Sequence, residues 1–280
     1  MSLRSPSLLC ESKMKKALTF VIPVRHQDNA RDWNKLKSNL TATIKSIAAQ
    51  QNSDWKAIIV ANRGADLPAL PSGFDVKWVD FESNPLHEQG DIDKETFYEA
   101  VRLDKGRRIL AGMLHAGPMQ HVMVVDDDDF ISNKLSTLVS ANPQANGWYI
   151  REGYVWGDGS NYVYRFVDFS KLCGTCYMVR ADLYELPASF EEASDDYVKR
   201  MLGSHIFIRD FLEKSGKPLA PVPFVGAVYR VGHVGSHSKS TSVFKQYFHK
   251  GLVKTPVELV RRLRRLSFIS PAMRSEYFGE

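Results

Sequence analysis

The stretch His121–Asp129, HVMVVDDDD, decides the fold, because an apolar run typical of a buried strand leads directly into four adjacent aspartates. Neighbouring carboxylates repel one another and lose hydration near a folded core, so a strand that ends in them needs compensating positive charge. Mg2+ and Mn2+ provide it, since both prefer carboxylate oxygens. In an extended chain Asp126 and Asp128 point to the same side and can serve one site. A solvated acidic turn is the alternative, but the preceding all-apolar strand favours metal or substrate binding.

Further apolar runs precede this stretch and alternate with helical patterns. The predicted strands are Leu18–Val24, Lys56–Ala61, Asp75–Phe81 and His121–Val125, and the predicted helices are Trp33–Gln50 and Asp91–Ala116. This alternation predicts βαβ units, which means a Rossmann-like, mostly parallel α/β sheet with helices on both faces. Ligands of such sheets bind beyond the carboxyl ends of the strands, where the sequence places Arg25, Asn62 and Asp80.

The second half of the chain has a different pattern. It predicts a hairpin of Trp148–Trp156 and Asn161–Asp168, strands at Cys173–Val179 and Val222–Val231, and helices at Asp195–Leu202 and Ile206–Lys214. A last helix, Val257–Leu266, carries Arg261, Arg262, Arg264 and Arg265 among aliphatic residues. This pattern indicates either a helix that lies on an anionic membrane or a helix that packs on the domain and exposes its basic face to solvent.

Composition supports a folded protein with an anionic partner. The chain has 280 residues, 44% of them hydrophobic and 25% charged, which is typical of globular domains. The net charge of +5 fits a nucleotide, a nucleic acid or a membrane surface. Three cysteines argue against a disulfide framework and favour reduced, packed thiols. No segment approaches the ~20 apolar residues of a membrane span, so we expect a cytoplasmic location.

Several motifs resemble glycosyltransferases of the GT-A fold, particularly family-two enzymes. Val125–Asp129 resembles their Asp-x-Asp element, and Phe20–Arg25 (FVIPVR) resembles their opening strand. Lys105–Arg108 (KGRR) is similar to the segment that contacts donor phosphates, and Gly216–Pro223 is similar to a late strand. The resemblance covers roughly residues 15 to 240. One departure concerns the second strand, which ends in Asn-Arg-Gly here and usually in Asp followed by Gly-Ser in the family.

The resemblance implies roles for residues at the expected site. Asp126 and Asp128 would hold Mn2+ or Mg2+, and a late histidine, His233 or His237, would be a further metal ligand. The nucleotide-sugar pocket would be lined by Pro23, Val24, Arg25, Asn62, Arg63, Asp80, Arg107, Asp126 and Asp127.

The general base and the acceptor contacts are open at this stage. Inverting family members place an acidic pair at a helix start, which Asp195 and Asp196 would supply, whereas counting back along the following helix puts His205 at that position. Either group could take a proton from an acceptor hydroxyl. Capping of a helix N-terminus is the structural alternative for the aspartates. Trp156, in a glycine-rich turn, is the candidate for acceptor stacking.

These observations predict a GT-A-like domain with a leader and an extension. We expect a flexible leader (1–14), a catalytic domain (15–240) with a nucleotide-sugar half (15–130) and an acceptor half (131–240), and a basic helical extension (241–280).

The expected activity is transfer of a hexosyl unit from a nucleoside diphosphate sugar, with UDP favoured, to a hydroxyl of a saccharide or lipid-linked acceptor. Cell-surface polysaccharide or glycolipid synthesis would use such a reaction, with peripheral contact to the inner face of the membrane and without nucleic acid. The alternatives are a nucleotidyltransferase and a non-enzymatic anion- or nucleic-acid-binding module. A nucleotidyltransferase usually has a glycine-rich phosphate loop after its first strand, and Pro23–His26 is not one.

Overall fold

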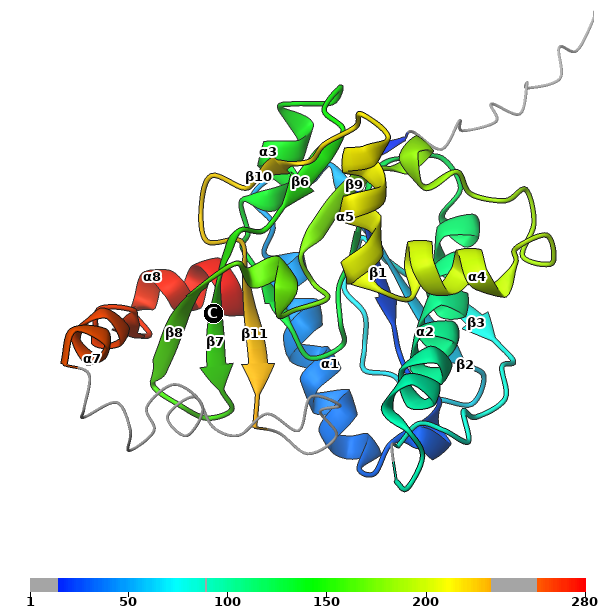
Figure 1. Cartoon of the computed structure of the whole chain (residues 1–280), viewed down its shortest axis with the longest axis horizontal. Helices are drawn as coiled ribbons and strands as arrows, with labels where there is room; N and C mark the ends of the chain where they lie inside the picture. Colours follow the sequence, from blue (N-terminus) through cyan, green and yellow to red (C-terminus); the bar gives the residue numbers. More distant parts are fainter. Residues whose placement is uncertain (1–14, 89, 233–255) are drawn as a thin grey trace, which may run out of the picture.

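The computed structural model describes residues 15–88, 90–232 and 256–280 (Figure 1). The predicted leader, the predicted boundary at residue 240, Cys10, His233 and His237 all lie outside these ranges.

A seven-stranded sheet forms the centre of the molecule, in the order β10-β6-β9-β4-β1-β2-β3. Its parallel half consists of β1 (Lys16–Pro23), β2 (Trp55–Asn62), β3 (Phe74–Val79) and β4 (Met119–Val124). The other half consists of β9 (Tyr177–Arg180), antiparallel to both of its neighbours, then β6 (Gly147–Tyr149) and β10 (Ala220–Pro221). The predicted α/β architecture with a mostly parallel sheet is therefore confirmed, and strands from both predicted halves of the chain share this one sheet.

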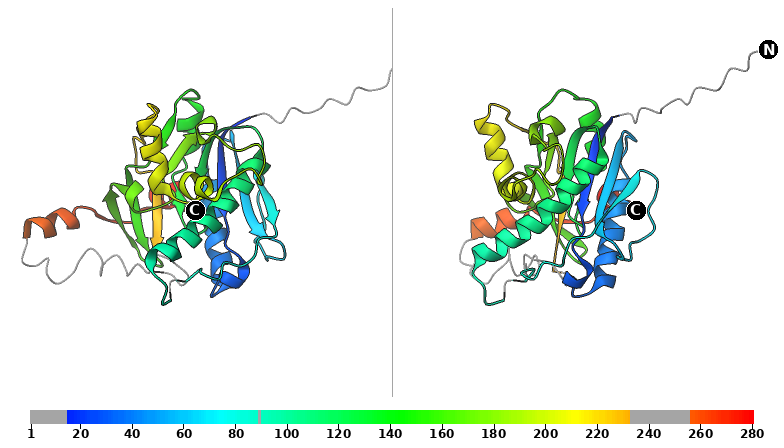
Figure 2. Two further views of the ribbon diagram at one scale, coloured as in Figure 1. Left: turned by 45° about the vertical axis from the view of Figure 1, so that its right-hand side comes forward. Right: turned by 90° about the vertical axis from the view of Figure 1, so that its right-hand side faces the viewer.

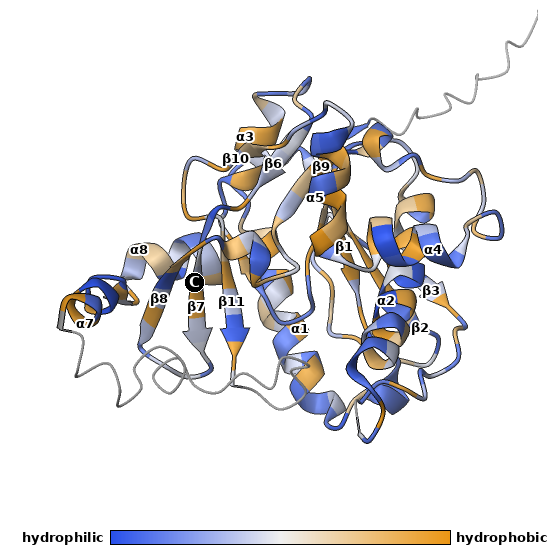
Figure 3. Cartoon of the chain, in the orientation of Figure 1, coloured by the Kyte–Doolittle hydropathy of each residue, from blue (hydrophilic) through white to orange (hydrophobic). Residues whose placement is uncertain are grey.

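Burial explains why the parallel strands have continuous apolar runs. Seven of the eight residues of β1 are buried, as are seven of the eight residues of β2, because helices cover both faces of the sheet. In Figure 3 the hydrophobic colouring is concentrated in these central strands and on the helix sides that face them.

Two long helices connect the parallel strands. Helix α1 (Trp33–Ala48) begins where the Asp32 carboxylate accepts from the backbone N–H of Lys35 at 2.9 Å. Helix α2 (Lys94–Ala116) begins after Asp93 in the same way. The chain crosses the sheet in one direction from β1 through α1 to β2, and in the opposite direction from β3 through α2 to β4. Because both crossovers are right-handed, α1 and α2 lie on opposite faces of the sheet (Figure 2).

A second sheet of five strands lies beside the first, in the order β12-β8-β7-β11-β5. Its strands are β5 (Phe130–Ile131), β7 (Glu152–Gly157), β8 (Tyr162–Val167), β11 (Ala227–Val231) and β12 (Leu266–Phe268). The remaining helices are α3 (Leu135–Ser140), α4 (Asp195–Tyr197), α5 (His205–Lys214), α7 (Pro256–Leu263) and α8 (Pro271–Met273). Within the described residues, no helix has the length and hydrophobicity of a membrane span.

Three sequence predictions in the second half need correction. The single strand expected over Trp148–Trp156 is divided between the two sheets, as β6, which pairs with β9, and β7, which pairs with β8 and β11. The fully buried Ile150 lies between them, and its N–H donates to the Cys176 carbonyl. The strand expected from Cys173 starts only at Tyr177. Helix Asp195–Leu202 is one short α-helical turn followed by a π-helical segment, Val198–Leu202.

The C-terminal residues belong to the folded body. Strand β12 pairs with β8, and Tyr277 and Phe278 are buried against Phe130. Their packing is aromatic: the rings of Phe130 and Phe278 have centroids 4.7 Å apart. The described part of the predicted basic extension thus completes both the second sheet and a small core.

We therefore expect Phe278→Ala to lower the free energy of unfolding by about 3 kcal/mol, because it empties a packed aromatic site. The matched change Phe268→Ala, at a side chain that is 67% exposed, should cost less than about 1 kcal/mol. Urea denaturation of both variants measures the difference, and equal losses would contradict the assigned packing.

Candidate active site at the end of strand β4

The four aspartates follow β4 through the buried residue Val125 and lead into β5. Asp127 and Asp129 are buried, whereas Asp126 and Asp128 are half-buried. Burial thus alternates along the run, but Asp127 and Asp128 lie in a turn, in which the Asp129 N–H donates to the Asp126 carbonyl at 3.3 Å. The extended chain expected from the sequence is therefore wrong at this point.

Asp126 is paired with a lysine from helix α2. The Lys105 ammonium lies 2.5 Å from the Asp126 carboxylate, with both side chains less than one-third exposed. Burial alone would lower the pKa of Lys105, but the attraction of Asp126 and its hydrogen bond outweigh burial, and the pKa is raised. Lys105 is therefore charged and supplies local compensation for the acidic run.

Asp129 is fully buried and compensated by hydrogen bonds. Its carboxylate accepts from the Thr175 hydroxyl at 2.6 Å, the Cys173 thiol at 3.1 Å and the backbone N–H of Arg230 at 3.3 Å. Burial, followed by the charges of Asp128 and Asp126, raises the pKa of Asp129 well above its usual value. Asp129 thus ties β4 to the segment before β9 and to β11, and its role is structural.

The residues before β9 form one wall of the site. The Thr175 hydroxyl also accepts from the backbone N–H of Asp126 at 3.0 Å. A Cβ on Gly174 would lie 3.0 Å from the Asp126 carboxylate and 3.1 Å from the Lys105 ammonium, so a larger residue would press on this ion pair. Cys173 and Cys176 are free and buried, and burial raises the pKa of both thiols, which confirms for these two the predicted packed, reduced state.

A cavity opens beside the Asp126–Lys105 pair. It is lined by Lys105, Val124, Gly174, Tyr177, Tyr184, Met201, Leu202, Ser204, His205 and Ile208. Its wall thus combines one lysine, one histidine and two tyrosines with aliphatic side chains, a mixture that suits a polar organic ligand.

His205 reaches this cavity because two backbones approach closely. A Cβ on Gly203 would lie 2.0 Å from the carbonyl oxygen of Arg102, so only glycine lets the start of α5 lie against α2. Ser204 caps α5 through the N–H of Ile206. The Nε2 atom of His205 is buried and has no hydrogen-bond partner among the described residues. Burial, followed by the Lys105 charge, lowers the pKa of His205 to about 4, so its imidazole is neutral at pH 7.

The alternative acidic pair lies outside the cavity lining. Asp195 is paired with Arg107 at 3.2 Å, and Asp196 with Arg200 at 2.8 Å, and all four side chains are substantially exposed. The Ser194 hydroxyl caps this helical turn. Arg107, proposed from sequence as a phosphate contact, therefore points to α4 in this structure.

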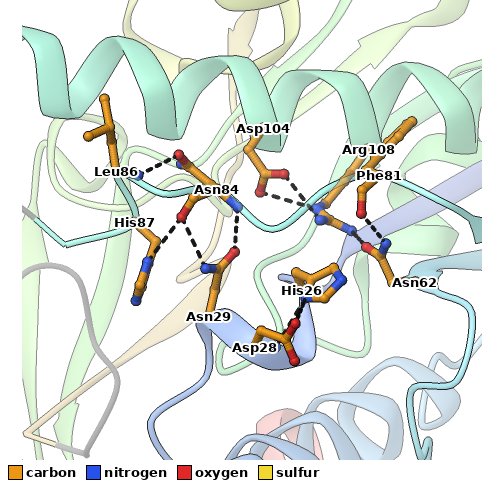
Figure 4. A network of polar contacts seen from close by, with 10 residues as sticks. All are labelled: His26, Asp28, Asn29, Asn62, Phe81, Asn84, Leu86, His87, Asp104 and Arg108. Carbon is orange, nitrogen blue, oxygen red and sulfur yellow. Dashed lines mark hydrogen bonds and ion pairs between the residues drawn. The ribbon is translucent and has the colours of Figure 1, made fainter.

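Residues at the ends of β2 and β3 form a network of their own (Figure 4). The buried Arg108 donates to the Asn62 side-chain oxygen at 2.7 Å and pairs with Asp104 at 3.1 Å, while the Asn62 amide nitrogen donates to the Phe81 carbonyl at 2.6 Å. A direct nucleotide contact by the Asn62 side chain would require one of these bonds to break.

The other sequence candidates lie at the same sheet edge or beside it. Pro23 and Val24 are buried, and Arg25 is half-buried where β1 ends. Arg63 and Asp80 form an exposed ion pair at 3.1 Å.

Trp156 is held within the second sheet. Its indole N–H donates to the Ser160 carbonyl at 2.8 Å, and its ring packs against Phe130, Phe278 and the Arg230 guanidinium. Trp156 therefore has a packing role that its glycine-rich turn did not indicate.

The aspartate run fits a divalent cation by its donor chemistry. Asp126 and Asp128 are half-buried and offer hard carboxylate oxygens. The described residues contain no group of three or more histidine, cysteine, aspartate or glutamate side chains arranged as a metal site. Strand β11 borders the run, because the backbone N–H of Arg230 donates to Asp129, whereas the candidates His233 and His237 lie outside the described residues.

Sequence reasoning missed the partners that make the acidic run possible. The sequence shows Lys105 only as part of a basic motif and gives no role to Thr175. A partial signal is present, because the long lysine side chain can reach a neighbouring strand end and the short threonine hydroxyl can bond to an adjacent backbone.

Comparison with known proteins finds no matching family model and no matching curated protein. Solved structures that match include residues 1–349 of TarS from S. aureus, with a TM-score of 0.44, 11% identity, and coverage of 78% of this chain and 60% of that one. A second TarS structure matches with a TM-score of 0.40, 12% identity, and coverage of 78% and 37%. A manganese complex of Rv0371C from Mycobacterium tuberculosis H37Rv matches with a TM-score of 0.36, 13% identity, and coverage of 77% and 92%. The chain spans less than two thirds of either TarS chain, and the likeness is one of fold alone.

We expect the His205 imidazole to take up a proton only near pH 4. In the unfolded chain a histidine binds its proton near pH 6.5, so the folded state loses stability as the pH falls from about 6.5 towards 4. An NMR titration checks this, with the His205 resonances identified from their absence in His205→Gln. Protonation of His205 above pH 6 would contradict the buried environment described here.

Proposed function

We propose that this chain is a metal-dependent glycosyltransferase that moves a hexosyl unit from a nucleoside diphosphate sugar, with UDP favoured, to a hydroxyl acceptor. One observation carries the proposal: a cavity at the carboxyl end of β4 is lined by Lys105, which pairs with Asp126, and by His205, whose Nε2 atom has no hydrogen-bond partner among the described residues. A cation that can bind phosphate and a group that can accept a proton thus lie in the same cavity. Transfer of a sugar from a nucleoside diphosphate to a hydroxyl requires both.

The donor diphosphate would lie beside the aspartate run. Asp126 and Asp128 would hold Mn2+ or Mg2+, with His233 or His237 as a further ligand. A bound divalent cation would supply Lewis-acid neutralisation of the diphosphate charge. Lys105 adds a second positive charge at the same place, and its pairing with Asp126 keeps the ammonium turned towards the cavity wall. Arg25, Arg63 and Asp80 are the remaining candidates for nucleotide contact at this sheet edge.

The acceptor hydroxyl would meet His205. The neutral ring offers a buried nitrogen without a partner, which is the state that a general base needs before it takes a proton. With a pKa of about 4, His205 is a weak base. A bound diphosphate would add negative charge beside the imidazole and so raise the pKa of His205. Asp195 and Asp196 are less suited, because each is exposed and held by an arginine.

The acceptor is proposed to be a saccharide or a lipid-linked saccharide of polysaccharide or glycolipid synthesis. Tyr177 and Tyr184 line the cavity and give it aromatic surface for a sugar ring. They replace Trp156 as our first candidates for that contact, since the Trp156 ring is packed within the second sheet.

Calorimetric titration tests the donor site. We expect wild-type protein to bind UDP or GDP in the presence of Mn2+, and Asp128→Asn to weaken binding at least tenfold, because one carboxylate ligand of the metal is lost. Asp210→Asn removes an exposed carboxylate on α5 and serves as the matched control, with unchanged binding. Absence of binding for both nucleotides, with and without metal, would overturn the proposal in favour of a non-enzymatic module.

Substitution of His205 tests the assignment of the base. We expect His205→Gln to lower kcat by about 100-fold or more, while metal-dependent nucleotide binding stays unchanged. Asp195→Asn should retain nearly full activity. Transfer to the acceptor, measured as release of the nucleoside diphosphate, reports both. Retention of activity in His205→Gln together with its loss in Asp195→Asn would assign the proton transfer to the acidic pair instead.

A further inference from the structure

Helix α7 presents its apolar residues to solvent. Val257, Val260 and Leu263 are 83%, 49% and 50% exposed, and their spacing puts them on one side of the helix. The Glu258 and Arg262 side chains, on another side, are only 26% and 24% exposed. A helix that packs on a water-soluble domain normally has the reverse arrangement. The sequence left open a helix lying on a membrane and a packed helix with a solvated basic face, and in the structure the apolar side chains named above are themselves solvated.

A further exposed apolar side chain lies in the strand that follows the helix. Phe268 in β12 is 67% exposed, and β12 pairs with β8 in an antiparallel register that sets Phe268 opposite Tyr162. We name Val257, Val260, Leu263 and Phe268 the α7 surface. These are four of the nine exposed large hydrophobic side chains of the described residues.

Positive charge surrounds the α7 surface. Arg261, Arg262, Arg264 and Arg265 lie within or just after α7, against one glutamate. Glu258 pairs with Arg261 at 2.6 Å and with Arg262 at 2.7 Å. In the described parts of the chain no carboxylate pairs with Arg264 or Arg265. The charge at this end of the molecule is therefore only partly neutralised by the protein itself.

We propose that the α7 surface docks on an anionic lipid bilayer. Aliphatic and aromatic side chains that enter the acyl boundary, combined with arginines at headgroup level, are the combination that binds such membranes. Helix α7 stands out at one end of the molecule, away from the seven-stranded sheet, so a flat surface can reach it (Figures 1 and 2). Figure 3 shows both hydrophobic and hydrophilic residues along this helix.

Two other occupants fit the chemistry less well. A second copy of this chain, docked by two-fold symmetry, would bring the same arginine cluster from both copies towards one interface, where like charges repel. A nucleic acid would use the arginines through its phosphates but would leave the aliphatic residues exposed to water. An anionic bilayer offers acyl chains to the apolar side chains and negatively charged headgroups to the arginines. This inference does not depend on the proposed transferase activity.

Vesicle flotation tests the proposal with the full chain. We expect wild-type protein to float with vesicles of phosphatidylcholine containing about one-third phosphatidylglycerol, and not with phosphatidylcholine alone. Val260→Asp with Leu263→Asp, and separately Arg264→Glu with Arg265→Glu, should each weaken the partition coefficient about tenfold or more. The first pair removes the apolar contribution and the second reverses the charge.

Matched controls are available on helix α5 and just after it. Phe207→Asp changes another exposed apolar residue, and Lys214→Glu with Lys217→Glu reverses two exposed charges. Neither control should alter flotation, and circular dichroism should show that all variants are folded. The proposal is overturned if wild type does not float, if either α7-surface variant floats as well as wild type, or if sedimentation shows a dimer that Val260→Asp with Leu263→Asp dissociates while vesicles bind nothing.

Discussion

The structure depends on one electrostatic constraint, the placing of four successive carboxylates at the end of a buried strand. Two of the four, Asp126 and Asp129, are compensated from different elements. Lys105 of α2 neutralises Asp126, while Thr175, Cys173 and the backbone of β11 satisfy Asp129. Because the cost of an uncompensated buried carboxylate is several kcal/mol, these elements must converge on the strand end for the fold to be stable.

This convergence also explains how two sheets join. The chain leaves β4 through the aspartates and enters β5, which pairs with β11 in the smaller sheet, while the segment before β9 returns to the larger sheet beside β4. Asp129 binds both of these returning segments. Asp129, a buried carboxyl group that would otherwise destabilise the core, therefore joins the two sheets through these hydrogen bonds, while Asp126 and Asp128 stay half-buried.

The sequence was sufficient for the parallel half of the fold and for the location of the acidic run. Continuous apolar runs and a 3.6-residue period are local signals, and they identified β1, β2 and β4 together with α1 and α2. Contacts between distant segments carry no local signal. The pairing of Lys105 with Asp126, the placing of His205 through the close approach at Gly203, and the division of the strand at Ile150 all depend on tertiary packing.

We propose that the carboxylates at the end of β4 form the metal and diphosphate site. Crystals grown with Mn2+ and a nucleoside diphosphate would reveal the ion by anomalous diffraction at a wavelength where manganese scatters strongly. We expect one manganese peak about 2.2 Å from carboxylate oxygens of Asp126 or Asp128, with the diphosphate in contact with the same ion. A nucleotide bound elsewhere on the protein, or a manganese peak away from both aspartates, would be incompatible with this site.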